Sequence, residues 1–297
     1  CTIVDVPADL CESRERGGDG VLLDSTKLET VSLAHLALTN PRGLAGLEPL
    51  FERTHGGGAR NPGWLPIKLK RECVDLNASC VVRAPSAGDR DPTWLGFALV
   101  GTPPSLAPCA RMSGMGVVPR YRGRGLARRM LAHIQGALPS THDKLRCLSE
   151  PRNRSMYAHL GFQESHHIAT LLHFGAGSNT ALADPLDARP GRGEIIAQWL
   201  DETWVHSPVE SKRLWETEDG RAYLTREGCS LLVHRFELAD TSEIERGALI
   251  LDQLRASVER DTPVLVYGWP DDPDALRSVE HRGWQVAQRA GVRVRGY

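Results

Sequence analysis

The 297-residue sequence has no long apolar run and almost no excess of charge of either sign. No stretch approaches the ~20 apolar residues that a bilayer-spanning helix needs, so we expect no membrane span. The 36 lysines and arginines are balanced by 37 aspartates and glutamates, which gives a formal net charge of −1. A balance of this kind provides no overall field to attract nucleic acid or an anionic membrane, and neither is expected as a partner.

Cysteine is sparse and scattered, which argues against a disulfide framework. The seven cysteines are odd in number, and no two have Cys-x-x-Cys spacing. In a chain this long, such usage fits reduced thiols, and we expect a cytoplasmic protein without a zinc site. The first residues contain no basic segment followed by an apolar core, so no signal peptide is expected. His166, His167 and His173 have no further ligand at metal-binding spacing, and no metal is expected.

The sequence divides into two segments of ordered elements. Residues 1–27 are largely polar and are interpreted as an N-terminal extension, and residues 176–193 are rich in Gly and Pro and are interpreted as a linker. A first domain at 28–175 and a second at 194–297 remain. We predict an α/β fold with a mixed sheet flanked by helices in each.

Hydrophobic patterning predicts the elements of the first domain in some detail. Strands are expected at 28–38, 73–82, 94–100 and 110–118, and a helix at 126–138. The second domain is expected to begin with a helix at 195–204. Two loops, 55–63 and 84–92, are candidates to contact a substrate but contain no recognisable signature.

Both domains end in the same order of elements. A short strand is followed by a proline, a short helix, a Gly-aromatic pair and a final strand, with Gly161-Phe162 in the first domain and Gly283-Trp284 in the second. Few residues are identical between the two segments. The shared order nevertheless indicates an internal duplication.

Residues 117–127 are the most informative stretch and read Val-Val-Pro-Arg-Tyr-Arg-Gly-Arg-Gly-Leu-Ala. A predicted strand ends at Pro119, a basic glycine turn follows, and Leu126 opens a periodic helix. Gly123 and Gly125 allow the backbone to approach an anion closely. Backbone N–H groups at the start of a helix, reinforced by the helix dipole, bind phosphate, so the stretch predicts a phosphorylated ligand.

With a second motif downstream, Asn153-Arg-Ser-Met-Tyr157-Ala-His-Leu-Gly161-Phe162, the turn resembles the GNAT acyltransferases. The resemblance implies acetyl-CoA or another acyl-CoA as donor. It further implies that the turn holds the pyrophosphate, that the backbone of Met115 and Val117 pairs with pantetheine, and that Tyr157 protonates the leaving thiolate. The implied pyrophosphate-binding residues are Arg122, Gly123, Arg124, Gly125, Leu126 and Ala127. Asn153 lies closer to the tyrosine than the family's asparagine, so no contact is assigned to it.

The general base is not evident from the sequence. Transfer to an amine needs a group that accepts its proton. The strand at 110–115 contains no acid. Asp75 is better explained as a solvated turn residue and His133 as a surface histidine, while Ser149 and Glu150 end a short strand and remain open as residues that face the cleft.

The second domain lacks the glycine turn. Residues 236–243 include Glu237, Asp240 and Glu243 at the corresponding place, and these acids would repel a pyrophosphate. Val279 stands where Tyr157 stands in the first domain. We interpret the second domain as a degenerate GNAT-like domain that binds no CoA and either completes the acceptor pocket or replaces the partner subunit of a dimer.

The sequence therefore predicts an N-acetyltransferase that transfers an acetyl group from acetyl-CoA to an amine of a small molecule or peptide. Direct attack in a ternary complex is favoured over an acyl-enzyme on Cys147, because no histidine partner is apparent. A monomer or weak dimer is expected. Two alternatives remain open: a non-catalytic acyl-CoA sensor, and an acyltransferase that transfers a longer acyl chain to a peptide amine.

Overall fold

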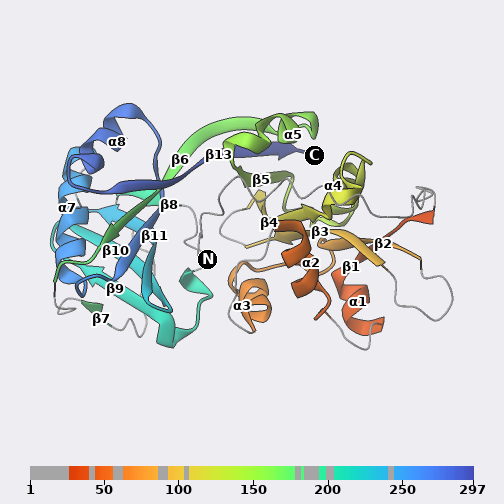
Figure 1. Ribbon diagram of the computed structural model, residues 1–297, viewed down its shortest axis with the longest axis horizontal. Coiled ribbons are helices and arrows are strands. Elements are labelled where there is room, and N and C mark those ends of the chain that lie inside the picture. The colour runs from red at the N-terminus through yellow and green to blue at the C-terminus, as the bar shows by residue number, and fades with distance from the viewer. Residues whose placement is uncertain are drawn as a thin grey trace.

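The computed structural model describes residues 27–39, 44–55, 63–85, 93–103, 107–177, 182–183, 194–198, 204–239 and 244–297. Nearly all of the predicted N-terminal extension, most of the predicted linker and most of the two candidate loops lie outside these residues. The described strands form one 13-stranded mixed sheet in the order β1-β2-β3-β4-β5-β13-β6-β12-β11-β10-β9-β7, and β8 pairs with β11. Figure 1 shows the two segments at opposite ends of this sheet.

The elements of the first segment are β1 (Glu29–Ser32), α1 (Leu33–Thr39), α2 (Leu47–His55), α3 (Trp64–Arg71), β2 (Cys80–Ala84), β3 (Thr93–Gly101), β4 (Cys109–Val117), α4 (Leu126–Ala137), β5 (Lys144–Ser149), α5 (Arg154–His159) and β6 (Gln163–Phe174). Those of the second are β7 (Leu182–Ala183), β8 (Glu194–Gln198), β9 (Lys212–Glu216), β10 (Gly220–Glu227), β11 (Ser230–Leu238), α7 (Ile244–Ser257), β12 (Pro263–Pro270), α8 (Pro273–Glu280) and β13 (Gln285–Gly296).

Helices cover both faces of the sheet in the first segment. The apolar stripe of α4, including Met130 and Ile134, packs with Leu145 and Cys147 of β5 on one face. Helices α1, α2 and α3 pack on the other face, where Phe97 lies at the centre of a second core. The gap between β4 and β5 therefore lies between two helical layers.

The two segments exchange their last strands. β13 from the end of the chain lies between β5 and β6, and β6 lies between β13 and β12. Ala290 follows Ile168 by the same number of residues as Gly283 follows Gly161. Ile168 and Ala290 are paired in the β6–β13 ladder. A pseudo-two-fold axis therefore passes through this pair, as the side-by-side course of β6 and β13 in Figure 1 illustrates. The predicted duplication is confirmed in the order and pairing of the elements.

The predictions for β3, β4 and α4 are confirmed to within a residue or two. The strand predicted at 28–38 is wrong beyond Ser32, where the chain forms helix α1 instead. This helix buries Leu33 and Leu36 on one of its sides. The strand predicted at 73–82 begins only at Cys80. Before it, the Asp75 carboxylate accepts the N–H groups of Asn77 and Ala78, which fixes a turn.

The helix predicted at 195–204 is also wrong. Residues 194–198 form strand β8, which pairs antiparallel with β11. The edge of β11 supplies the hydrogen-bond partners of β8. Residues 194–198 themselves contain no pattern that reveals this distant edge. Helix α3 and strand β9 are additional elements that the patterning did not predict.

Candidate active site

Among the described residues, strand β4 has an unpaired edge where it separates from β5. The two parallel strands pair only from Cys109↔Lys144 to Arg111↔Arg146. On its other side β4 continues to pair with β3 as far as Val117↔Gly96, with a register shift near Ser113. From Met112 onward, the edge that faces β5 is therefore open to pair with an extended ligand. Met115 and Val117, the predicted pantetheine contacts, both lie on this open part of β4.

The glycine turn leads directly from the end of β4 into α4. Gly123 and Gly125 have φ values of 74° and 76°, in the left-handed region that favours glycine. No side chain caps α4 at Gly125. Within the described chain, the backbone N–H groups of residues 123–128 donate no hydrogen bond, and a Cβ on either glycine would meet nothing within 4 Å. The turn is an exposed group of N–H donors at a helix start, which is suited to bind an anion.

The two arginines of the turn differ in their surroundings. The Arg122 guanidinium donates to the carbonyl oxygens of Val117 and Thr54 at 3.1 Å each, so this side chain attaches the turn to β4 and α2. Arg124 is exposed and lies over the Tyr121 ring at 5.8 Å. Of the two, Arg124 is the one whose charge faces solvent beside the free N–H groups.

Tyr157 lies on α5, next to the gap between β4 and β5. The residue is 8% exposed, and its ring packs edge-on against Phe162. Burial, together with Cys147 and Glu150, raises the pKa of Tyr157 well above its usual value, although Arg293 acts to lower it. The hydroxyl is therefore protonated at neutral pH. Among the described residues it makes no hydrogen bond, so its proton is available to a ligand.

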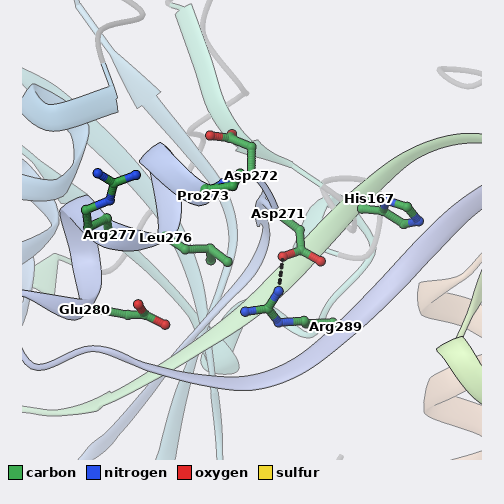
Figure 2. A pocket seen from close by; sticks show the side chains of 8 residues that line it. All are labelled: His167, Asp271, Asp272, Pro273, Leu276, Arg277, Glu280 and Arg289. Atoms are coloured by element: carbon green, nitrogen blue, oxygen red, sulfur yellow. Dashed lines mark ion pairs between the residues drawn. The ribbon is translucent and has the colours of Figure 1, made fainter.

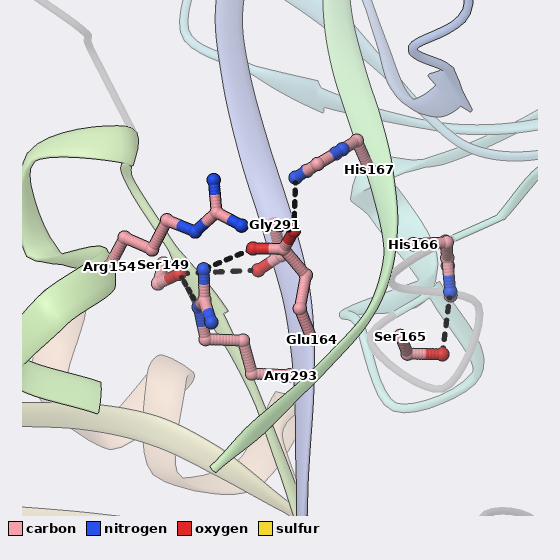
Figure 3. Close-up of polar contacts among 8 residues, drawn as sticks. All are labelled: Ser149, Arg154, Glu164, Ser165, His166, His167, Gly291 and Arg293. Carbon is pink, nitrogen blue, oxygen red and sulfur yellow. Dashed lines mark hydrogen bonds and ion pairs between the residues drawn. The ribbon is translucent and has the colours of Figure 1, made fainter. Parts of the chain in front are cut away.

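A buried polar network beside Tyr157 joins the two segments, and sequence reasoning missed it (Figure 3). Arg293 of β13 donates from Nε to Ser149 Oγ at 2.6 Å and from a terminal nitrogen to Glu164. Glu164 also accepts from His167 at 3.1 Å and lies 3.4 Å from Arg154. Desolvation acts to raise the pKa of Glu164, but His167, Arg154 and Arg293 outweigh it and lower this pKa. The sequence shows at this place an arginine between two valines, Val292 and Val294.

The candidate bases differ in how they are held. The Asp75 carboxylate is used in its turn, and a ring nitrogen of His133 lies 3.1 Å from the Asn77 carbonyl oxygen. Glu72 was not considered from the sequence. Burial would raise the pKa of Glu72, but Lys68 and Arg111 lower it, so the carboxylate is a weak base. Glu150 interacts electrostatically with Tyr157 and lines a cavity described below.

Two cavities lie near the exchanged strands. One of about 490 Å³ surrounds the Asp271–Arg289 ion pair beside α8, and His167 of β6 also lines it (Figure 2). The other, of about 220 Å³, lies on the pseudo-two-fold axis. It is lined by Leu148, Glu150, Ile168, Thr170, Tyr267, Gly268, Gln288 and Ala290. The larger cavity does not include a residue of β4, β5 or the glycine turn, whereas the smaller one begins at the end of β5.

The second segment repeats the diverging strands but not the open edge. β11 and β12 pair in parallel only from Leu231↔Val264 to Val233↔Val266. Further along, β8 pairs with β11 on that side, from Arg235↔Gln198 to Leu238↔Glu194. Val279, which takes the place of Tyr157, is fully buried. A strand of the chain itself thus covers the edge that is open in β4.

Within the described ranges, no helix is long and apolar enough to cross a membrane. The same residues contain no group of three or more His, Cys, Asp or Glu side chains placed to hold a metal ion.

Comparisons with known proteins agree with this geometry. Residues 89–164 match the family model of the acetyltransferase (GNAT) domain, and this match contains β4, the glycine turn and Tyr157. None of the curated proteins compared matches the chain in sequence.

Three solved structures have the fold of the whole chain. A putative acetyltransferase from Pyrococcus horikoshii is 11% identical with a TM-score of 0.57, over 95% of this chain and 93% of that one. A GCN5-related N-acetyltransferase from Sphaerobacter thermophilus is 16% identical with a TM-score of 0.52, over 91% and 96%. A tandem GNAT protein from the clavulanic acid biosynthesis pathway is 14% identical with a TM-score of 0.52, over 91% and 98%. The chain therefore has the fold of tandem GNAT proteins, and residues 89–164 in its first segment match an acetyltransferase (GNAT) domain.

Proposed function

We propose that the protein transfers an acetyl group from acetyl-CoA to a primary amine, at one site in the first segment. The observation that carries this proposal is the junction of an open β4 edge with a turn of unpaired N–H groups. In this proposal the N–H groups of residues 123–128, with Arg124, bind the pyrophosphate. The backbone of Met115 and Val117 pairs with pantetheine, and an N–H group of β4 stabilises the oxyanion.

Tyr157 has the properties of a general acid for the leaving thiolate. It is protonated at neutral pH, has no hydrogen-bond partner among the described residues and lies beside the β4–β5 gap. Removing a general acid typically costs about 10²- to 10⁴-fold in rate.

Direct transfer in a ternary complex fits the state of Cys147. Burial raises the pKa of this thiol to about 12, so it is not ionised at neutral pH. The thiolate is the nucleophilic form, and a buried neutral thiol is a poor acceptor for an acyl group. Such a free, buried thiol is also compatible with the reducing cytoplasm that we propose as the location.

The second segment is proposed to replace the partner subunit of a dimer that exchanges strands. Its own β11 edge is covered by β8, and β13 completes the sheet of the first segment. We expect a monomer or weak dimer with one CoA site per chain.

Calorimetric binding of acetyl-CoA, combined with an assay of thiol release in the presence of primary amines, tests the proposal. Gly125→Glu should abolish acetyl-CoA binding, because it places a carboxylate in the turn. Gly136→Glu is the control, since this exposed position lies near the other end of α4 and has nothing within 4 Å of its added Cβ. Tyr157→Phe should retain binding and lose about 10²- to 10⁴-fold in turnover. Unchanged binding by Gly125→Glu would refute the assignment of the turn, and tight binding without any turnover would favour a sensor.

A further inference from the structure

The 220 Å³ cavity on the pseudo-two-fold axis has a position and a composition that the donor site does not explain. Its walls come from both segments. Leu148, Ile168 and Thr170 belong to β5 and β6, and Tyr267 and Ala290 belong to β12 and β13. Strand exchange is what brings these four strands together, so the cavity exists only in the assembled pair of segments.

The cavity lies on the opposite face of the sheet from α4. In β5, Leu145 and Cys147 pack with α4, whereas Leu148 packs with Ile168 and Val292 on the other side. Tyr157 belongs to the core on the α4 face. An amine in the cavity would therefore approach the β4–β5 gap from the face opposite to the proposed acid. This arrangement separates the attacking amine from the leaving thiolate.

The charge of the cavity favours a cation. Glu150 is the one carboxylic acid among its eight lining residues, none of the eight is Lys, Arg or His, and burial raises the pKa of Tyr267 to about 12. The Glu150 carboxylate does not cap the short helix that follows it. In the described part of the chain its ion pair is with Arg152, whose side chain is 79% exposed. A ligand ammonium can replace such a solvated partner at little cost.

The size of the cavity limits the ligand. Pockets for drug-sized molecules are typically about 300–1,000 Å³, and this one is smaller. Three of its lining residues, Leu148, Ile168 and Ala290, are apolar. The volume and the lining of the cavity therefore match a ligand with a short alkyl or benzyl group and one ammonium.

We propose that this cavity binds the acceptor as a small primary alkylammonium, and that Glu150 holds the ammonium and removes its proton. This inference rests on the proposed function. Glu150 takes one proton from the ammonium and later releases it to water. The amine nitrogen forms the C–N bond to the thioester carbonyl carbon, the C–S bond breaks, and sulfur receives the proton of Tyr157. The remaining extra proton on nitrogen returns through solvent to the Tyr157 phenolate.

The test compares two amines in the acetyl-CoA-dependent thiol-release assay. Propylamine is protonated at neutral pH, whereas methoxyamine is not. Glu150→Gln should lower kcat/KM for propylamine by about 100-fold or more, the typical scale for losing a general base, and for methoxyamine by less than about fivefold. Arg152→Gln is the control, because it removes the exposed ion-pair partner of Glu150 and should leave both values unchanged or higher.

A second variant tests the cavity without changing charge. Ala290→Leu should fill the space opposite Ile168 and raise KM for propylamine and benzylamine at least about tenfold, while calorimetric binding of acetyl-CoA stays the same. Gln285→Leu, at an exposed position of the same strand outside the cavity, should behave as wild type.

The outcomes separate this inference from the proposed function. Wild-type turnover with unchanged kcat/KM in Glu150→Gln and Ala290→Leu would overturn the cavity assignment alone. Equal losses for propylamine and methoxyamine in Glu150→Gln would overturn the proton-accepting role. A wild-type enzyme that binds acetyl-CoA but acetylates no amine would overturn both. Turnover of peptide amines alone would overturn the assignment of a small acceptor.

Discussion

Replacing Arg293 with Met should destabilise the whole protein, because this buried side chain adds polar contacts to the strand pairing that joins the two segments. The Arg293 side chain is 4% exposed and donates to Ser149 and Glu164 of the first segment. Removing one partner of a buried ion pair costs about 3–5 kcal/mol when the other is left bare. Here Glu164 is 23% exposed and keeps His167 and Arg154 as partners. We therefore expect a loss of about 2–3 kcal/mol in the free energy of unfolding, somewhat below that range.

Urea and thermal unfolding at pH 7.5, followed by circular dichroism, measure this loss. At about 2–4 °C per kcal/mol for large domains, the midpoint should fall by roughly 4–12 °C. Arg277→Met is the control. Arg277 pairs with Asp274 at 2.8 Å, but the two side chains are 62% and 85% exposed, and such pairs contribute at most about 1 kcal/mol. An Arg293→Met protein that unfolds within about 0.5 kcal/mol of wild type would refute the reasoning, because measured surface substitutions fall in that range.

Three further changes test separate parts of the structure. Glu164→Gln should reduce stability at pH 7. The pKa of Glu164 in the folded protein is lower than its ordinary 4.5, so its contribution to the free energy of unfolding is complete above pH 4.5 and is lost as the pH falls through the folded pKa. In urea unfolding at a series of pH values, the difference in stability between wild type and variant should therefore shrink in acid. Gly123→Ala should weaken acetyl-CoA binding in calorimetry about tenfold, because φ is 74° there and holding alanine in this left-handed conformation for the ligand costs about 1–2 kcal/mol. Gly136→Ala should bind normally, and equal affinities of the two variants would contradict the role of the turn. Cys147→Ala should retain acetyl transfer in the thiol-release assay, and its loss in a folded variant would contradict direct transfer.

The parts of the site that the sequence predicted are those encoded by neighbouring residues. The glycines at 123 and 125, the apolar strand before them and the periodic helix after them lie within one short stretch, and each has a local physical signal. Tyr157 was assigned through the resemblance to the GNAT acyltransferases, by its spacing to Gly161-Phe162, and its role as an acid stays a prediction. The local backbone arrangement could be predicted because a strand, a tight turn and a helix in immediate succession can be arranged in few ways.

The parts that the sequence did not predict depend on pairing between distant strands. Strand β8 was mistaken for a helix because its partner, the edge of β11, lies far along the chain. The burial of Arg293 was not predicted either, because it depends on the insertion of β13 between β5 and β6. The hydrophobic period of a strand gives no information about which other strand pairs with it. When such a strand is inserted between two others, its side chains become buried although its sequence pattern is that of an exposed strand.

The exchange of β6 and β13 explains why a segment without a glycine turn still has a structural task. If β13 were removed, β5 and β6 would lose their common neighbour, Ser149 and Glu164 would lose Arg293, and the cavity beside Glu150 would lose the wall that contains Ala290. None of these contributions requires the second segment to bind a nucleotide. The covering of β11 by β8 and the presence of Val279 in place of a tyrosine therefore leave the strand, the arginine and the cavity wall intact. On this reasoning, substitutions at β8 should alter stability without altering acetyl-CoA affinity, whereas in β13 substitution of Arg293 should lower stability and substitution of Ala290 should alter the use of the amine.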